Sequence, residues 1–561
     1  MAWAWHVHAV AGTVPSSGLD PRAAERDGQK PPQFGRHDPV VPRGPTGPRH
    51  LEEAHVQIDR RRLAALSAAT ILLTTAAATP ALAKPNPNNS KKLTQAVTVE
   101  AVHDHLEVFQ ALADKHGNRA SGTDGYAAGA EYVVSQLKAA GYTPEIQEFG
   151  FDYWELESAS LKQTAPSQRD LAGNPMEYSP SAPAGGVSGP LVAPANPLGC
   201  EVKDYAGADL TGKIALVSRG TCAFAVKAVT AGAAGALGVI VYNNAPGELN
   251  GTYGGLDDAH VPGFGITQEL GQDLLAQVAA GTVGVHLDVQ ADSRAETTFN
   301  IIAETDTGRS DNVVMLGAHL DGVVDGPGIN DNGSGSAAIL ETAIQLAEVN
   351  KLNNKVRFAW WGAEENGLLG SWHYVDDLVA RDQQNGTDEL GNIATYLNFD
   401  MVASPNHVIG VYDADESTHK APVEVPRGSA ESEAVFTGYF DRIGQAWVDT
   451  EFSGRSDYQA FISNGVPASG LFTGADGVKT PEQVSLFGGT AGITYDPNYH
   501  TAKDDLANVD LEALDVMSDA IAHAAITLAQ DTAAINGKHS AGKSGKPHPR
   551  EALPVGEHDA A

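Results

Sequence analysis

The sequence has few cysteines, few basic residues and no long apolar run. Two cysteines among 561 residues exclude a cysteine-rich zinc scaffold and a disulfide-dense miniprotein. Lys and Arg number 37 against 70 Asp and Glu, a formal net charge of −33. A chain this acidic repels phosphate backbones and anionic lipid surfaces, which argues against nucleic-acid binding. The hydrophobic fraction of 42% suits a globular protein, and the length allows two to four domains of about 150 residues.

The first 83 residues predict a leader. A run of three arginines at 60–62 precedes an uncharged stretch at 63–78, which is too short to span a bilayer comfortably. Ala81-Leu82-Ala83 then supplies the small residues of a cleavage site. We expect a signal peptide over about 56–83, translation starting near residue 56, and secretion with cleavage after Ala83. A retained anchor is the alternative, and the arginines leave twin-arginine export open.

Short β-rich runs alternate with long helical runs through most of the remaining chain. Strands are predicted at 143–154, 300–303, 313–318, 356–361 and 396–399, and helices at 100–140, 336–348, 370–378 and 511–529. This alternation predicts an α/β fold with a mostly parallel mixed sheet flanked by helices. In such sheets ligands bind beyond the C-terminal ends of the strands. Residues 536–561 lack apolar periodicity and predict a disordered tail.

Five potential metal ligands stand where predicted strands end or helices begin. His319, Glu365 and Asp400 follow strands, whereas Asp331 and His500 lie in loops ahead of helices. Each signal is weak alone, because a lone His is usually structural and an Asp before a glycine-rich turn is usually a turn residue. A sheet could still bring all five to one edge. Two imidazoles and three carboxylates suit zinc or a similar divalent cation, with too few oxygens for a calcium cage.

Residues 165–295 differ from their surroundings in being rich in Gly, Ala, Pro and Val. Arg219 to Lys227 resembles the pattern R-G-x-C-x-F-x-x-K of the protease-associated (PA) domain, and an Ala/Gly-rich helix and a strand follow it. The resemblance implies a small β-rich insert that acts as a lid or binding module and divides the main domain into 84–164 and 296–535. Cys200 and Cys222 lie inside it. Export permits a disulfide between them; two free buried thiols are the alternative.

The potential ligands belong to a set of ordered motifs. These are GAHLD (317–321), GINDNGSG (328–335), WGAEENGLLGS (361–371), NFDM (398–401) and YHTAKDD (499–505). The set resembles the secreted di-zinc aminopeptidases of peptidase family M28, with their zinc exopeptidase-like fold, over residues 100–160 and 296–530. Some members carry a PA insert at this point. Residues 119–123 resemble the family's R-x-x-G-T stretch, to which no chemistry is assigned.

The resemblance implies a role for each residue of the site. Asp331 would bridge two Zn²⁺ ions, with His319 and Asp400 completing one site and Glu365 and His500 the other. Of the remaining residues, Glu364 would be the general base, Tyr499 a donor to the developing oxyanion, Asp321 the acceptor for the far nitrogen of His319, and Arg455 a substrate contact.

The implied function is a secreted aminopeptidase that hydrolyses N-terminal residues from peptides or proteins with a free N-terminus. It would bind no nucleic acid and, after signal cleavage, no membrane. A metallo-carboxypeptidase on the same core and a non-enzymatic peptide-binding relative are the alternatives.

Overall fold

The computed structural model of the protein describes residues 89–538. The predicted leader, with its signal peptide, and residues 539–561 of the predicted tail lie outside the described residues. Between residues 89 and 538, none of the helices has the length and apolar character needed to cross a membrane.

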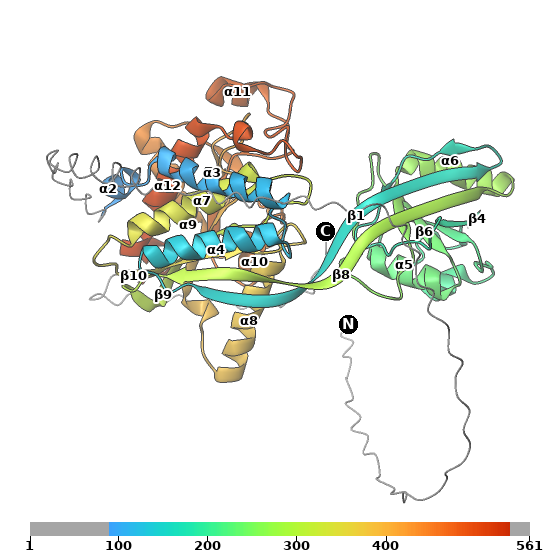
Figure 1. Ribbon diagram of the computed structural model, residues 1–561, viewed down its shortest axis with the longest axis horizontal. Helices are drawn as coiled ribbons and strands as arrows, with labels where there is room; N and C mark the ends of the chain where they lie inside the picture. Colours follow the sequence, from blue (N-terminus) through green and yellow to red (C-terminus); the bar gives the residue numbers. More distant parts are fainter. Residues whose placement is uncertain (1–88, 539–561) are drawn as a thin grey trace, which may run out of the picture. The chain divides into compact units, whose positions relative to one another are not determined.

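A mixed sheet forms the centre of the larger domain (Figure 1). Its strand order is β13-β12-β14-β11-β9-β10-β8-β1. The strands are β1 (Glu145–Ala165), β8 (Gly284–Glu304), β9 (Arg309–His319), β10 (Asn354–Trp361), β11 (Ile393–Phe399), β12 (Gly410–Tyr412), β13 (Val448–Thr450) and β14 (Ala468–Phe472). Strand β9 is parallel to β10 and β11, and β11 to β14. Strand β8 is antiparallel to β10, as β12 is to β14. The predicted fold class is confirmed.

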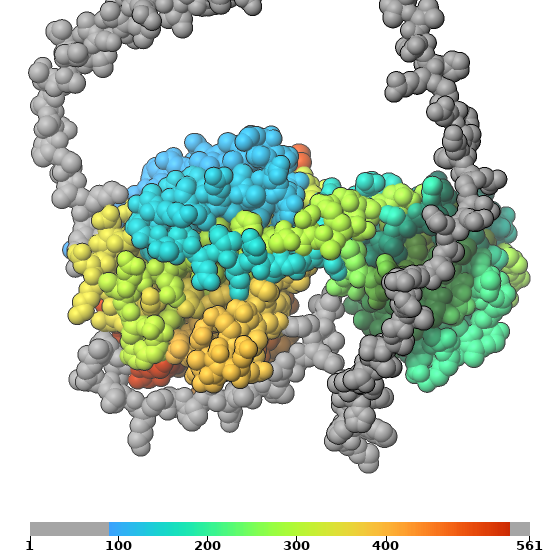
Figure 2. Space-filling model, turned by 60° about the horizontal axis from the view of Figure 1, so that its bottom comes forward, coloured from blue at the N-terminus to red at the C-terminus, as the bar shows by residue number. Residues whose placement is uncertain are grey.

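Helices cover both faces of this sheet, because successive side chains of a strand point to opposite faces. Val314 and Leu316 of β9 belong to one core, whereas Met315 belongs to the other. The first core is completed by α3 (Val99–His116), α4 (Asp124–Ala139), α7 (Gly335–Leu346), α9 (Ser429–Ile443) and α12 (Leu511–Gln530), and the second by α8 (Leu369–Asn385) and α10 (Tyr458–Ser463). Figure 2 shows α8, in orange, at the surface.

Two helices occupy the region in which the sequence predicted a single one over 100–140. Thr98 caps α3 by accepting a hydrogen bond from the Ala101 N–H, and Gly117, with φ 96°, ends it. Thr123 caps α4 by accepting from the Tyr126 N–H. The intervening segment is irregular because a left-handed glycine and a new N-cap interrupt the helical pattern.

Outside the insert, the remaining helical elements of residues 89–538 are short. They are α2 (Ser90–Thr94), η2 (Ile329–Ser334), η3 (Leu390–Asn392), α11 (Pro481–Phe487), η4 (Leu506–Asn508) and α13 (Ala533–Asn536).

The insert is connected to the rest of the chain by β1 and β8, two 21-residue strands that pair antiparallel with each other. Its own strand order is β4-β5-β6-β7-β3. Its elements are β2 (Arg169–Asp170), β3 (Asn174–Pro175), β4 (Val187–Val192), η1 (Val202–Tyr205), β5 (Ile214–Ser218), α5 (Phe224–Ala233), β6 (Gly238–Tyr242), β7 (Gly263–Ile266) and α6 (Gln268–Ala280). The expected boundary at 165 coincides with the end of β1, whereas the one at 295 falls within the unbroken β8.

The two cysteines of the insert form a disulfide, Cys200–Cys222. Lys227, the last residue of the pattern noted above, is completely buried beside it. Its Nζ donates to the Leu198 carbonyl at 2.6 Å and to the Gly220 carbonyl at 3.2 Å. The lysine therefore ties together the two turns that carry the cysteines.

Candidate metal centre

Two of the five potential ligands lie at the ends of neighbouring parallel strands. His319 is the last residue of β9, and Asp400 directly follows β11. The register pairs Asn398 with Gly317, so both side chains emerge at the same edge of the sheet. His319 Nε2 lies 3.2 Å from Asp400 Oδ1. Both residues are at most 9% exposed, so the pair is shielded from bulk water.

Asp331 connects this pair to the opposite side of the site. Its Oδ1 lies 3.2 Å from His319 Nε2, and its Oδ2 lies 3.2 Å from Nε2 of His500. The Asp504 carboxylate holds the loop by accepting the N–H groups of Asn330 and Asp331 at 2.9 and 3.0 Å. Each oxygen of Asp331 thus faces a different imidazole, as a carboxylate that bridges two cations must.

Glu364 and Glu365 reach the site from the loop after β10. Glu365 Oε2 lies 3.0 Å from His500 Nε2, and Glu364 Oε2 lies 3.9 Å from His319 Nε2. Ligand atoms of His319, Asp331 and Glu365 lie within 4.8 Å of one another, as do those of His319, Glu364 and Asp400. The structure therefore brings together all five predicted ligands and the predicted base.

The donor atoms fit divalent cations. Glu365 Oε1 is buried without a hydrogen-bond partner, although polar groups in protein interiors are normally satisfied. Burial, together with the negative charge of Asp331, raises the pKa of Glu365 to about 7. Carboxylates crowded in this way repel one another, and a bound cation would relieve that repulsion. Imidazole and carboxylate donors suit zinc, whose structural and catalytic sites use both.

Burial opposes ionisation of both imidazoles, but the surrounding carboxylates outweigh it. The pKa of His319 is raised well above its usual value by Glu364 and Asp400, against the effect of burial. The pKa of His500 rises to about 10, because Glu365 and Asp331 more than offset burial. Without a cation the cluster would therefore hold protons on its imidazoles. Metal binding must release those protons, since a ligating imidazole is neutral.

Asp321 lies beside His319, and its main-chain carbonyl is closer to the imidazole than the carboxylate that the sequence predicted as the acceptor. Nδ1 of His319 lies 3.1 Å from the main-chain carbonyl oxygen of Asp321 and 3.6 Å from its carboxylate. The close acceptor is thus the peptide group rather than the side chain. The carboxylate instead accepts the N–H groups of Glu364 and Glu365 at 3.3 and 3.4 Å. Because the backbone already supplies an acceptor at Nδ1, the carboxylate is free to orient the glutamate loop.

Tyr499 and Arg455 lie at the rim. The Tyr499 ring stacks on His500, with ring centroids 3.8 Å apart. The Arg455 side chain is 58% exposed, and its guanidinium pairs with Asp476 at 3.2 Å. The stacked ring is held next to the ligands, whereas the arginine is engaged by a carboxylate at the surface. Of these two residues, Tyr499 is therefore the one in direct contact with a potential ligand.

Sequence reasoning assigned no role to two residues that orient the ligands. Ser456 donates its hydroxyl to Asp400 Oδ2 at 2.6 Å, and Asp504 holds the Asp331 loop as described above. Both stand inside segments that carry other candidate residues, 455–458 and 499–505. Their position in those segments could have marked both residues as lying near the site. It could not show which group each side chain bonds to, because those partners come close only when the chain folds.

Gly328 offers a test of how tightly the Asp331 loop is held. Its φ is +63°, and a Cβ there would lie 2.6 Å from the Asp331 carbonyl oxygen. Gly328→Ala should cost about 1–3 kcal/mol in free energy of unfolding and reduce metal retention, measured by thermal unfolding and metal content. Gly129→Ala is the matched control, because nothing lies within 4 Å of that Cβ. Equal unfolding temperatures for the two variants would contradict this account.

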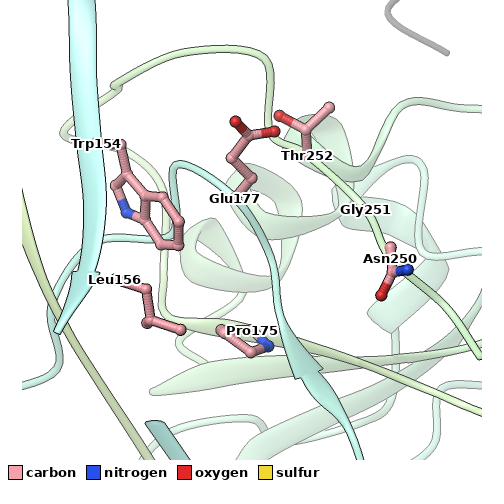
Figure 3. Close-up of a pocket in the computed structure, with 7 residues that line it drawn as sticks. All are labelled: Trp154, Leu156, Pro175, Glu177, Asn250, Gly251 and Thr252. Carbon is pink, nitrogen blue, oxygen red and sulfur yellow. The ribbon is translucent and has the colours of Figure 1, made fainter. Parts of the chain in front are cut away.

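A separate pocket of about 330 Å³ lies in the insert and at its junction with β1 (Figure 3). It is lined by Trp154, Leu156, Pro175, Glu177, Asn250, Gly251 and Thr252. None of these residues belongs to the imidazole and carboxylate cluster. The pocket therefore adds no group to the candidate metal centre.

Comparisons with known proteins agree with this geometry. A family model described as Peptidase family M28 matches residues 300–525, and one described as PA domain matches residues 187–274. The chain is 46% identical to "Leucine aminopeptidase 2" of Trichophyton tonsurans over 443 residues, covering 79% of this chain and 86% of that protein.

Two solved structures share the fold. The aminopeptidase of Aneurinibacillus sp. strain AM-1 is 28% identical, with a TM-score of 0.62, over 78% of this chain and 95% of that one. BSAP, a zinc aminopeptidase from Bacillus subtilis, is 27% identical, with a TM-score of 0.52, over 76% and 94%.

Proposed function

Because this chain belongs to peptidase family M28, we propose that it is a secreted aminopeptidase that uses two zinc ions to release N-terminal residues from peptides. The observation that carries the proposal is Asp331, whose two carboxylate oxygens face two different imidazoles at 3.2 Å. His319 and Asp400 would hold one ion, and Glu365 and His500 the other. Asp331 would be shared between them.

The zinc ions would act as Lewis acids that make water a stronger nucleophile and stabilise negative charge on the carbonyl oxygen. Glu364 takes the proton of the attacking water as the oxygen–carbon bond forms. It then passes this proton to the amine as the carbon–nitrogen bond breaks. Burial raises the pKa of Glu364 well above its usual value, and the charges of Asp400, Asp457 and Glu365 add to this effect. A carboxylate in such surroundings is a stronger proton acceptor than an exposed one.

Two other features of the site support peptide-bond hydrolysis at a free N-terminus. Tyr499 stacks on His500, which would place its hydroxyl to donate to the oxyanion as negative charge develops there. The cluster of carboxylates would attract the α-ammonium group of a substrate. The net charge of −33 favours the approach of a cationic group over that of a free C-terminal carboxylate. This argues against a carboxypeptidase.

The proposal predicts that the protein hydrolyses leucine p-nitroanilide. Treatment with 1,10-phenanthroline should abolish release of p-nitroaniline, and added Zn²⁺ should restore it. N-acetyl-leucine p-nitroanilide is the control, because it keeps the side chain and the scissile bond but lacks the α-ammonium. Chelator-insensitive hydrolysis would refute the metal dependence.

The same assay separates the alternatives. If the protein does not hydrolyse leucine p-nitroanilide but removes a C-terminal glutamate from peptides, it is a carboxypeptidase. Zinc binding without hydrolysis of either substrate would identify a non-enzymatic binding protein. Secretion is tested independently by mass spectrometry of the exported protein, whose N-terminus should follow Ala83. A peptide from residues 1–50 in that protein would contradict the proposed cleavage.

A further inference from the structure

The irregular segment between α3 and α4 contains an arginine that is completely buried. Arg119 is 0% exposed, and its guanidinium donates to three main-chain carbonyls, those of Leu320, Pro327 and Gly328. Leu320 directly follows the ligand His319, and Gly328 opens the loop that carries Asp331. One side chain therefore joins the two backbone segments that carry these two ligands.

The guanidinium suits this position by its shape and its charge. Three carbonyls in different directions require donors in a fixed planar fork, which Arg has and Lys lacks. Burial lowers the pKa of Arg119 to about 10, while Asp504, Asp321 and Asp331 act in the opposite direction, so the group stays charged at neutral pH. The Phe109 ring lies 5.0 Å from the guanidinium carbon. The side chain is thus enclosed and has no freedom to serve a substrate.

Ser121, two residues later, contacts the third segment that carries site residues. Its hydroxyl oxygen accepts the N–H of Ala363 at 2.6 Å, and Thr298 donates its hydroxyl to the same oxygen at 3.2 Å. Ala363 immediately precedes Glu364 and has φ +53°, a left-handed conformation that is uncommon for alanine. A hydrogen bond to that N–H favours the turn that directs Glu364 and Glu365 into the site.

We propose that Arg119 and Ser121 form a brace that sets the affinity of the site for zinc by fixing the loops after β9 and β10 and the loop ahead of α7. Both are positioning residues, since neither contacts a ligand side chain. This inference rests on the proposed function in needing zinc as the bound cation. It gives a role to the segment 119–123, to which the sequence resemblance assigned no chemistry.

Competition with a chelator of known zinc affinity, on the purified full-length protein, tests the brace. Arg119→Met and Ser121→Ala should each weaken zinc binding about 10–100-fold, the usual effect of losing groups that orient metal ligands. Arg119→Lys keeps the charge but loses the fork, so it should recover only part of the affinity. If the charge of Arg119 mattered more than its shape, Arg119→Met would instead bind zinc more tightly, because a nearby positive charge repels the cation.

A partly buried arginine provides the control. Arg357 on β10 bonds to Glu304 and the Tyr374 hydroxyl and donates to none of the ligand loops. Arg357→Met should lower the unfolding temperature of the zinc-free protein while leaving zinc affinity within about twofold.

The outcomes separate the two proposals. If the wild-type protein binds no zinc, the proposed function fails and the brace fails with it. If the wild type binds zinc and the Arg119 and Ser121 variants bind it equally well, only the brace is overturned. Should Arg119→Met not fold, Ser121→Ala decides alone, because it removes a single hydroxyl and leaves the guanidinium in place.

Discussion

Replacing Glu364 with alanine is expected to lower kcat for leucine p-nitroanilide by about 10²–10⁴-fold while leaving zinc content unchanged. Glu364 Oε2 lies 3.9 Å from His319 Nε2, within reach of the reacting groups, yet the five ligands are complete without it. Its loss should remove proton transfer and little else. Steady-state kinetics on the zinc-loaded protein, with zinc content measured on the same sample, check this expectation.

The neighbouring glutamate supplies the control for that experiment. Glu365→Ala alters the same loop, but its side chain lies 3.0 Å from His500 Nε2, so it should lose zinc as well as turnover. Glu364→Gln keeps the size of the side chain and should resemble Glu364→Ala in activity. Near-normal activity of either Glu364 variant, or loss of zinc from both, would mean that base and ligand had been assigned incorrectly.

The sequence predicted the central strands well, because they are buried on both faces. The stretches 313–318, 356–361 and 396–399 are mostly apolar, with Arg357 and Asn398 as polar interruptions, and they lie within β9, β10 and β11. Strands β12 and β13 have three residues each, too few to show a period. The break between α3 and α4 was also missed. Gly117 and Thr123 signal this break, but helical apolar spacing is present both before and after it, so the region resembles one helix.

The candidate site was likewise predicted only in part from the sequence. The ligands could be found because each stands in a local motif whose spacing survives in the sequence. The contacts of the Asp321 carboxylate and of Arg119 could not, because their partners are main-chain groups that only the folded loops bring near. Arg119 lies 201 residues from Leu320 and 209 from Gly328. Every residue has a main-chain carbonyl. No local sequence pattern therefore shows which carbonyl will accept a hydrogen bond from a side chain at such a separation.

Replacing Asp331 with alanine should have the larger consequence of removing zinc itself. The residue is 5% exposed, and its two oxygens face the two imidazoles, one each. We expect the variant to lose at least one of two zinc ions and turnover to fall by about 10³-fold or more, since Lewis-acid catalysis supplies several kcal/mol. Zinc content and kcat measure the two effects separately.

Thermal unfolding shows whether the lost ions had stabilised the fold. A ligand that binds only the native state stabilises it by mass action, so zinc should raise the unfolding temperature of the wild type above that of the chelated protein. In Asp331→Ala this difference should shrink or vanish. Asp400→Ala is the matched comparison, because Asp400 faces the imidazole of His319 rather than both imidazoles, and its loss should affect one ion more than the other. Since Asp331 serves both proposed ions, its substitution must lower zinc content more than that of Asp400. The reverse order would rule out a carboxylate shared between two ions.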